Sequence, residues 1–327
     1  MSVVETVTSP APTPSHPRES GIPPEPRAQK PVVRAPLDSP GLPGWVQATP
    51  FAVVFLLFFV LPLAFVVMVS FWDYNDYEML PSFTLRSYIE SFDGCLTQLP
   101  DLCTMLKTYV STVRFCIIVW VLTLLIGFTV AYFLAFHVRS AITQMVLFLV
   151  CTIPFWTSNV IRMISWIPLL GRNGLVNQIL LGAHAISAPL EWLLFSPFSV
   201  ALAFVHLFTF FMVAPIFNSM MRIDRRLIEA AYDAGASGRQ MLTNVIIPLS
   251  KPGIAIGSIF VVTIVMGDFV TFGVMGGEQI ASAGKVVETR LDALQFPPAA
   301  ANAVILLCAT FLIITVLNRI VDIRKEL

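Results

Sequence analysis

The chain has 327 residues, of which 20 are Lys or Arg and 20 are Asp or Glu. These charged residues make up 12% of the sequence, about half the roughly 25% of a soluble domain. Hydrophobic residues make up 56%, and the mean hydropathy is +0.79. A soluble protein of this size could not cover its surface with so few charges, so the composition predicts an integral membrane protein. The two signs cancel, so net charge argues neither for nor against a nucleic-acid partner, and we predict none.

Residues 1–44 differ in composition from the rest of the chain. They hold 11 of the 24 prolines, mixed with polar and charged residues, and contain no hydrophobic run. Such a segment cannot bury enough apolar surface to offset its chain entropy, so we predict a disordered, proline-rich cytoplasmic tail. It is also too long and too polar for the start of a signal peptide. The remainder, residues 45–327, is then expected to be a transmembrane domain that begins with a retained membrane helix.

Hydrophobic runs then recur along the chain at the length needed to cross a bilayer, about 20 residues in a helix. The third run is broken by Pro154, and the fifth contains a single charge, Asp268. The predicted fold is therefore an all-α polytopic membrane protein with six transmembrane helices. The predicted spans are residues 51–72, 115–136, 140–161, 192–221, 253–277 and 293–318.

The basic residues between the predicted spans set the orientation of the chain. With a cytoplasmic N-terminus, 13 Lys and Arg residues fall on the inner side and 7 on the outer side. The first outer loop, roughly residues 73–109, is instead acidic. Because basic residues accumulate in cytoplasmic loops, we expect both termini in the cytoplasm.

The same outer loop carries Cys95 and Cys103. An oxidising compartment permits a disulfide between them, and two free thiols eight positions apart are equally compatible with the sequence. The other three cysteines lie in apolar spans and are expected to be small buried residues.

The cytoplasmic segment 222–252 differs from every other loop. Asp224 is a candidate N-cap, and Gly235 stands where a left-handed residue would end the helix that follows that cap. Ser237 and Gln240 have the spacing of a capping box at the start of a second helix. The pattern predicts two short helices joined at a glycine. An ordinary amphipathic loop at the membrane interface is the simpler alternative.

This segment resembles the EAA loop in the membrane subunits of type I ABC importers. The residues that match the motif are Glu229, Ala230, Ala231, Gly235 and Pro248. In that family the loop forms a coupling helix that docks into a cleft of the ATP-hydrolysing subunit. Val245 and Ile247 stand where Ile and Leu are commoner, a mild departure from the motif.

Further motifs look like those of the spermidine/putrescine permease subgroup, with similarity extending over about residues 51–325. They are 154–158, Ile161–Arg162, 169–174, Asn177 and 267–271. The resemblance implies a permease of the bacterial inner membrane, surrounded by lipid. It also implies three kinds of protein partner: a dimer of cytoplasmic ATP-binding subunits, a second permease and an extracytoplasmic substrate-binding protein.

The residues themselves give no indication of catalysis. The chain has no Gly-x-x-x-x-Gly-Lys-Ser/Thr loop, no His-Glu-x-x-His, no Cys-x-x-Cys and no Gly-x-Ser-x-Gly. Its four histidines are scattered without metal-ligand spacing. We therefore predict a transport subunit without cofactor, metal or catalytic residues, and expect ATP hydrolysis on a separate chain.

Four residues are candidates for the substrate pathway. Asp268 is costly inside a span, so it should face protein or water, where it would either meet a cationic cargo or bind a structural partner such as Arg162 or a backbone amide on another helix. Phe269 is its neighbour, and Phe155 and Trp156 follow Pro154. Aromatic faces attract ammonium groups, although packing is the simpler explanation for each ring alone. The resemblance to the spermidine/putrescine subgroup implies a polyamine as the cargo. Iron, an opine, a phosphonate or thiosulfate carried by the same importer type, or a stand-alone secondary transporter, are the alternatives.

Overall fold

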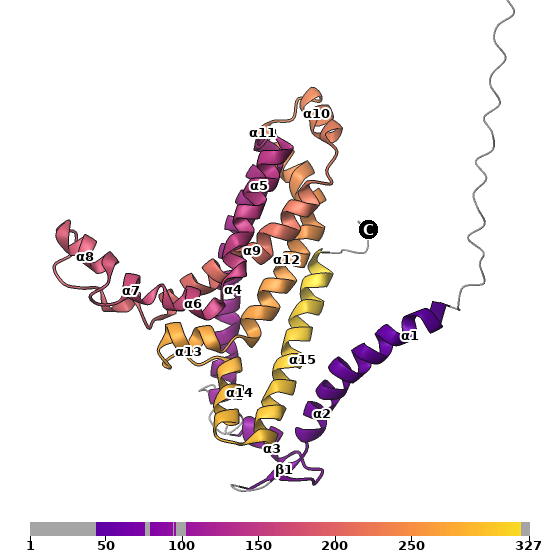
Figure 1. Ribbon diagram of the computed structural model, residues 1–327, viewed down its shortest axis with the longest axis vertical. Coiled ribbons are helices and arrows are strands. Elements are labelled where there is room, and N and C mark those ends of the chain that lie inside the picture. Colours follow the sequence, from indigo (N-terminus) through magenta and orange to yellow (C-terminus); the bar gives the residue numbers. More distant parts are fainter. Residues whose placement is uncertain (1–43, 76–78, 94, 96–102, 322–327) are drawn as a thin grey trace, which may run out of the picture. The chain divides into compact units, whose positions relative to one another are not determined.

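The computed structural model of the chain consists almost entirely of helices (Figure 1). It describes residues 44–75, 79–93, 95 and 103–321. The predicted tail therefore lies outside the described residues, apart from Gly44. Residues 1–54 and 55–327 form two units, and the described part of the first is helix α1 up to Val54.

The elements follow one another along the chain in a nearly all-helical order. The helices are α1 (Gly44–Phe55), α2 (Leu61–Val69), α3 (Arg86–Ser91), α4 (Thr104–Tyr132), α5 (Ala141–Thr152), α6 (Asn159–Ile164), α7 (Ile167–Leu170), α8 (Leu175–Gly182), α9 (Pro197–Met220), α10 (Arg225–Asp233), α11 (Gly238–Met241), α12 (Ile247–Gly267), α13 (Val270–Gly276), α14 (Ala283–Asp292) and α15 (Phe296–Val321). The π-helical turns are η1 (Leu56–Val60), η2 (Phe133–His137) and η5 (Leu242–Ile246), and the 3-10 turns are η3 (Ile153–Trp156) and η4 (Glu191–Leu193). Strands β1 (Asp73–Tyr74) and β2 (Met79–Leu80) pair antiparallel, with Asp73 opposite Leu80.

Five helical segments of the described residues are long and apolar enough to cross a membrane. They are Val46–Val69, Thr104–His137, Glu191–Met220, Gly238–Gly267 and Phe296–Arg319. A bent pair, Ala141–Trp156 and Asn159–Gly182, makes a sixth when the two pieces are counted as one span. The predicted all-α fold is confirmed, and each of the six predicted spans overlaps one of these segments.

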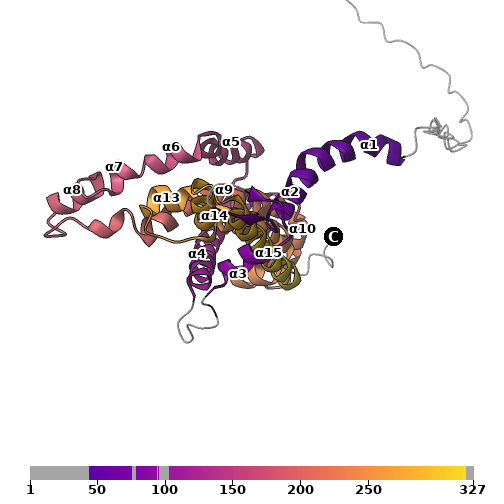
Figure 2. The same cartoon turned by 90° about the horizontal axis from the view of Figure 1, so that it is seen from below.

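The third predicted span is shorter than the sequence suggested. Helix α5 ends at Thr152, and the chain turns by 91° between Trp156 and Asn159. Pro154 has no N–H to donate to a helical carbonyl, and Thr157 is already extended, with φ −93° and ψ 151°. Helices α6, α7 and α8 consequently lead sideways away from α4 and α9 (Figures 1 and 2).

The fifth predicted span, 253–277, is two helices instead of one. Helix α12 ends at Gly267, Asp268 is extended with φ −74° and ψ 126°, and α13 begins at Val270. The sequence placed Asp268 within a continuous helix, and that placement was wrong. The carboxylate bonds to the start of the next helix, as short polar side chains do at helix ends.

Two of the π-helical turns precede a proline by two positions. Leu61 donates its N–H to Leu56 O before Pro62, and Ile247 donates to Leu242 O before Pro248. A proline ring crowds the carbonyl four residues back and offers it no hydrogen. The preceding turn therefore widens from α to π geometry.

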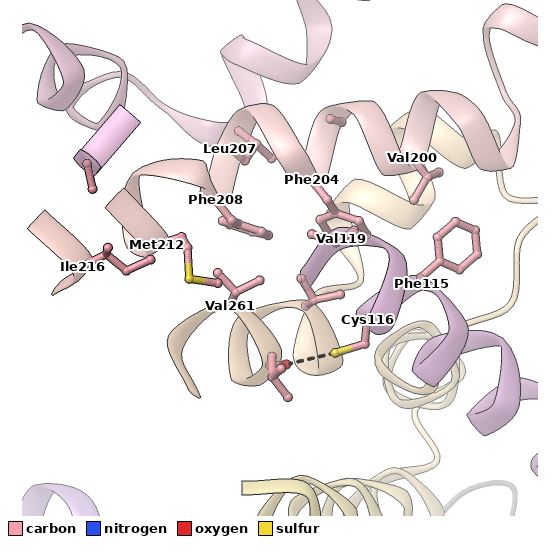
Figure 3. Packing of buried hydrophobic residues seen from close by; sticks show 14 of the residues in the cluster. Phe115, Cys116, Val119, Val200, Phe204, Leu207, Phe208, Met212, Ile216 and Val261 are labelled. Carbon is pink, nitrogen blue, oxygen red and sulfur yellow. Dashed lines mark hydrogen bonds between the residues drawn. The ribbon is translucent and has the colours of Figure 1, made fainter. Parts of the chain in front are cut away.

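Helices α4, α9 and α12 form the centre of the core (Figure 3). Phe115, Cys116 and Val119 from α4 meet a row of buried α9 side chains. That row comprises Val200, Phe204, Leu207, Phe208, Met212 and Ile216. Val261 closes the cluster from α12, and Cys116 Sγ donates to Val262 O at 3.9 Å. Packing of this density fixes the three helices as one body.

The contact between α9 and α12 depends on a glycine. A Cβ atom on Gly253 would lie 2.5 Å from Pro215 O and 2.6 Å from Ser219 Cβ. Only a residue without a side chain permits this approach of the two backbones. Helix α4 is joined to α12 by a hydrogen bond, in which Trp120 Nε1 donates to Ser258 Oγ at 2.8 Å.

Within residues 55–327, α10 and α11 lie at one end and α3, β1 and α14 at the opposite end (Figure 1). A disulfide joins Cys95 to Cys103 in the segment between α3 and α4. Of the two alternatives left open by the sequence, the structure therefore contains the bridge. The segment 222–252, which contains α10 and α11, therefore lies at the opposite end of the spanning helices from the disulfide.

Candidate coupling loop and translocation surface

Helix α10 is bounded by the local signals that the sequence contains. Asp224 Oδ1 accepts the N–H of Arg226 at 3.0 Å, which caps the first turn. Gly235 follows the helix with φ +83°, and its N–H donates to Tyr232 O at 2.9 Å. Left-handed residues end helices in this way, and glycine adopts that conformation without strain. The predicted cap and the predicted glycine stop are both confirmed.

The second helix of the loop begins with the predicted capping box. Ser237 Oγ accepts the N–H of Gln240 at 3.4 Å, and Gln240 Oε1 accepts the N–H of Ser237 at 2.9 Å. Helix α11 runs directly into turn η5 and then into α12, where Pro248 lies in the first turn. The loop is thereby joined to a membrane-crossing helix without a flexible connection.

The two sides of α10 differ in what they contact. Ile228 and Ala231 pack against the core cluster, whereas Leu227 and Tyr232 are 52% and 55% exposed. Glu229 and its neighbour Ala230 are also exposed, and Glu229 forms no ion pair within the described residues. Helix α10 thus presents an apolar and acidic surface that none of the described residues covers.

At the other end, Asp268 is held by its own helix start. Oδ1 accepts the N–H of Thr271 at 2.7 Å and Oδ2 accepts its hydroxyl at 3.1 Å. The carboxylate makes no ion pair in the part of the chain that the structure describes. The sequence suggested Arg162 or a backbone amide on another helix as its structural partner, and the structure has the second of these, the N–H of Thr271 in α13.

Phe269, next in the chain, lines a cavity of about 520 Å³ between α12, α14 and α15. Glu288 and Asp292 of α14 line it too, one helical turn apart, together with Thr263 and Thr310. Sequence reasoning missed the two acids. Their i, i+4 spacing after the N-cap Ser282 was a signal for a shared helix face.

Lys285 connects the acids at this end. Its Nζ lies 2.6 Å from Glu288 Oε2 and 2.8 Å from Glu278 Oε2. Partial burial alone would lower the pKa of Lys285, but the hydrogen bonds that its ammonium group donates to both carboxylates, and their negative charges, outweigh that effect and raise the pKa above its usual value. Lys285 therefore stays charged and compensates one of the two cavity acids, while Asp292 forms no ion pair among the described residues.

Phe155 and Trp156 lie elsewhere. The Phe155 ring packs 5.7 Å from Phe210 and 5.4 Å from Phe211, measured between centroids. It lines a second cavity, of about 340 Å³, which Arg162 and His206 also border. Trp156 is 81% exposed. Of the four candidate pathway residues, Phe269 lines the first cavity and Phe155 the second, whereas Asp268 and Trp156 line neither of the two. The four residues therefore do not form one site.

No group of three or more His, Cys, Asp or Glu side chains suited to a metal ion occurs among the described residues. The site is defined instead by its two ends: an exposed helix joined to the core, and a cavity with acids and an aromatic ring.

The family of the chain follows from comparison with known proteins. Residues 123–325 match the family described as "Binding-protein-dependent transport system inner membrane component". The spermidine/putrescine transport system permease protein PotB of Escherichia coli K12 is 30% identical over 253 residues, which are 77% of this chain and 88% of PotB. The PotB of Haemophilus influenzae is 31% identical over 243 residues, 73% of this chain and 80% of that protein.

A solved structure shares the fold. A bacterial ABC transporter that imports the acidic polysaccharide alginate has a chain with a TM-score of 0.66 and 15% sequence identity. The match covers 85% of this chain and 94% of that one.

From the family match and the PotB relatives, the chain therefore belongs to the binding-protein-dependent transport system inner membrane components, and it is a multi-pass permease subunit of an ABC importer in the inner membrane.

Proposed function

We propose that this permease carries polyamines such as spermidine and putrescine, or closely related organic cations. The observation that carries the proposal is the cavity in which Phe269 lies with Glu288 and Asp292. An ammonium group gains from carboxylates and from the face of an aromatic ring. The relatives named for spermidine and putrescine support the same cargo. Asp268, which precedes Phe269 in the chain, completes the proposed pathway at this end.

The exposed side of α10 is the proposed docking site for a cytoplasmic ATP-binding subunit, with two such subunits in the assembly. Glu229, Ala230 and Ala231 lie on this helix, and Gly235 ends it. Because α11, η5 and α12 continue without a break, movement at the helix would reach the span that begins near Pro248. A second permease and an extracytoplasmic binding protein complete the proposed importer.

The orientation belongs to the same proposal. The basic residues around α10 and α11 favour the cytoplasm for that end, with both termini and the tail of residues 1–44 on the same side. The disulfide at the opposite end fits an oxidising compartment.

Reconstitution tests the cargo. The chain would be purified with its ATPase, second permease and binding protein, and placed in liposomes that contain ATP. We expect ATP-dependent uptake of labelled putrescine that excess spermidine inhibits and that an anionic solute such as thiosulfate leaves unchanged. Uptake of thiosulfate in place of putrescine, from an active assembly, would contradict the proposed cargo.

A further inference from the structure

Arg162 is a buried cation without a counter-ion. Its side chain belongs to α6, the residue is 8% exposed, and its guanidinium donates from Nη2 to Asn159 Oδ1. Its Nε–H finds no acceptor, and no carboxylate pairs with it anywhere in the described residues. An unpaired buried charge is strongly unfavourable, more so in a chain surrounded by lipid.

The cavity beside Arg162 offers a second donor. Trp166 Nε1 donates to His206 Nδ1 at 3.1 Å. An indole nitrogen can only donate, so Nδ1 of a neutral His206 carries no hydrogen and Nε2 carries it. Arg162 and His206 both line the same cavity of about 340 Å³, so two side chains that carry N–H donors border it. A group that accepts hydrogen bonds and bears negative charge, a carboxylate, suits this lining.

The surroundings favour a protein as the source of that carboxylate. Ile161 and Ile164 of α6, the helix that carries Arg162, are 66% and 50% exposed, and Trp156, which precedes α6 in the chain, is 81% exposed. The cavity beside Arg162 is itself mostly apolar, and Ile126 and Val130 of α4 are among the residues that line it. A large apolar surface around one buried charge has the composition of a protein interface core. A cationic cargo would instead be repelled by Arg162.

We propose that an aspartate or glutamate side chain from a membrane helix of the second permease subunit enters this cavity and pairs with Arg162. The α6 surface around it is then the contact between the two permeases. This proposal rests on the two-permease assembly proposed above. It assigns to Arg162 the selection of the partner subunit, because a companion without the carboxylate would leave the charge buried and unpaired.

The proposed contact can be measured by how much of the second permease, here called the companion, stays bound to this chain during purification. The full importer would be purified through a tag on this chain, once as wild type and once as Arg162→Gln, and the amount of companion permease would be compared. We expect at least about tenfold less companion with Arg162→Gln, as for removal of one partner of a buried pair. Arg172→Gln is the matched control, because Arg172 is exposed and pairs with the exposed Glu191 at 3.5 Å.

The partner residue would be found by replacing each membrane-embedded Asp or Glu of the companion with its amide. Replacing the correct residue should reduce the amount of companion that the wild-type chain retains. It should have little further effect on the amount that the Arg162→Gln chain retains. If the Arg162→Gln chain retains as much companion as the wild-type chain does, the proposed contact is wrong and the two-permease assembly still stands. Failure of the wild-type chain to retain any companion would instead overturn the assembly itself.

A native cysteine gives a second measurement that leaves Arg162 unchanged, in case Arg162→Gln does not fold. Cys151 lines the cavity, and the other free cysteines, Cys116 and Cys308, can be replaced by alanine. An anionic methanethiosulfonate should label Cys151 in the chain alone and at least about tenfold more slowly in the importer, with or without cargo. Equal labelling in both, or protection only when a solute is added, would overturn the proposal.

Discussion

Asp268 and Thr271 form a closed pair in which both carboxylate oxygens accept a hydrogen bond from the same residue, at 2.7 Å from its N–H and 3.1 Å from its hydroxyl. The pair starts α13 where α12 has ended. Its two bonds satisfy the geometry of the carboxylate but supply no positive charge. Asp268 therefore combines a structural bond with an uncompensated negative charge at the proposed outer mouth of the pathway.

The first prediction separates the structural hydrogen bonds of Asp268 from its negative charge by removing the charge alone. Asp268→Asn keeps an oxygen for the Thr271 N–H and removes the negative charge. We expect normal insertion and a roughly tenfold rise in the apparent KM for putrescine, about 1.4 kcal/mol, as for one charged hydrogen bond. Transport by reconstituted importer measures it.

Thr271→Val is the control, because it removes the hydroxyl bond and leaves the charge. We expect a lower melting temperature in detergent with a KM near the wild-type value. If Asp268→Asn changes only stability, Asp268 has no part in recognising the cargo.

The second prediction concerns Asp292, the cavity acid without an ion pair in the described part of the chain. Asp292→Asn should weaken putrescine uptake by roughly fivefold to tenfold, because an ammonium group loses one charge partner at an exposed site. Glu278→Gln is matched to it in charge and in its place at the same end, but Glu278 does not line the cavity. Equal effects of the two variants would indicate a general surface potential instead of a site.

The helices of segment 222–252 could be predicted almost residue by residue, because the residues that begin and end them act on backbone groups close by in the sequence. Asp224, Gly235 and the Ser237–Gln240 pair each act on a backbone group within three residues. Chain geometry alone brings such partners together, so the sequence pattern is sufficient.

The pathway residues were harder to place because their surroundings are assembled from distant segments. Arg162 borders a cavity with His206, which is 44 positions away, and Phe269 meets Glu288 only because α14 folds back beside α12. An average of hydropathy along the sequence also treats two successive helices as one span when both are apolar. The sequence stays apolar across the bend after Pro154 and across the helix break at Asp268, so such an average detects neither.

The third prediction tests the close approach of α9 and α12. Gly253→Ala would place a methyl group 2.5 Å from Pro215 O, a backbone atom that cannot move aside alone. We expect a loss of about 1–3 kcal/mol, as for overpacked cores, seen as a lower melting temperature in detergent. Gly238→Ala is the control, since nothing lies within 4 Å of its added Cβ. A melting temperature unchanged by Gly253→Ala would mean that the two helices are further apart.

The last prediction separates coupling from stability at Gly235. An added Cβ meets nothing within 4 Å, yet φ is +83°, where an L-residue is strained by roughly 1–2 kcal/mol. Gly235→Ala should therefore leave the core and the assembly intact while shifting the α10–α11 junction away from the geometry that docks the ATPase. We expect basal ATP hydrolysis to persist and its stimulation by loaded binding protein to fall several-fold, together with uptake. Gly238→Ala provides the matched comparison, because Gly238 is equally open, lies three residues further on and does not have positive φ. Wild-type stimulation with Gly235→Ala would show that the left-handed turn is dispensable for coupling, and Glu229→Ala would then be the remaining test of the α10 surface.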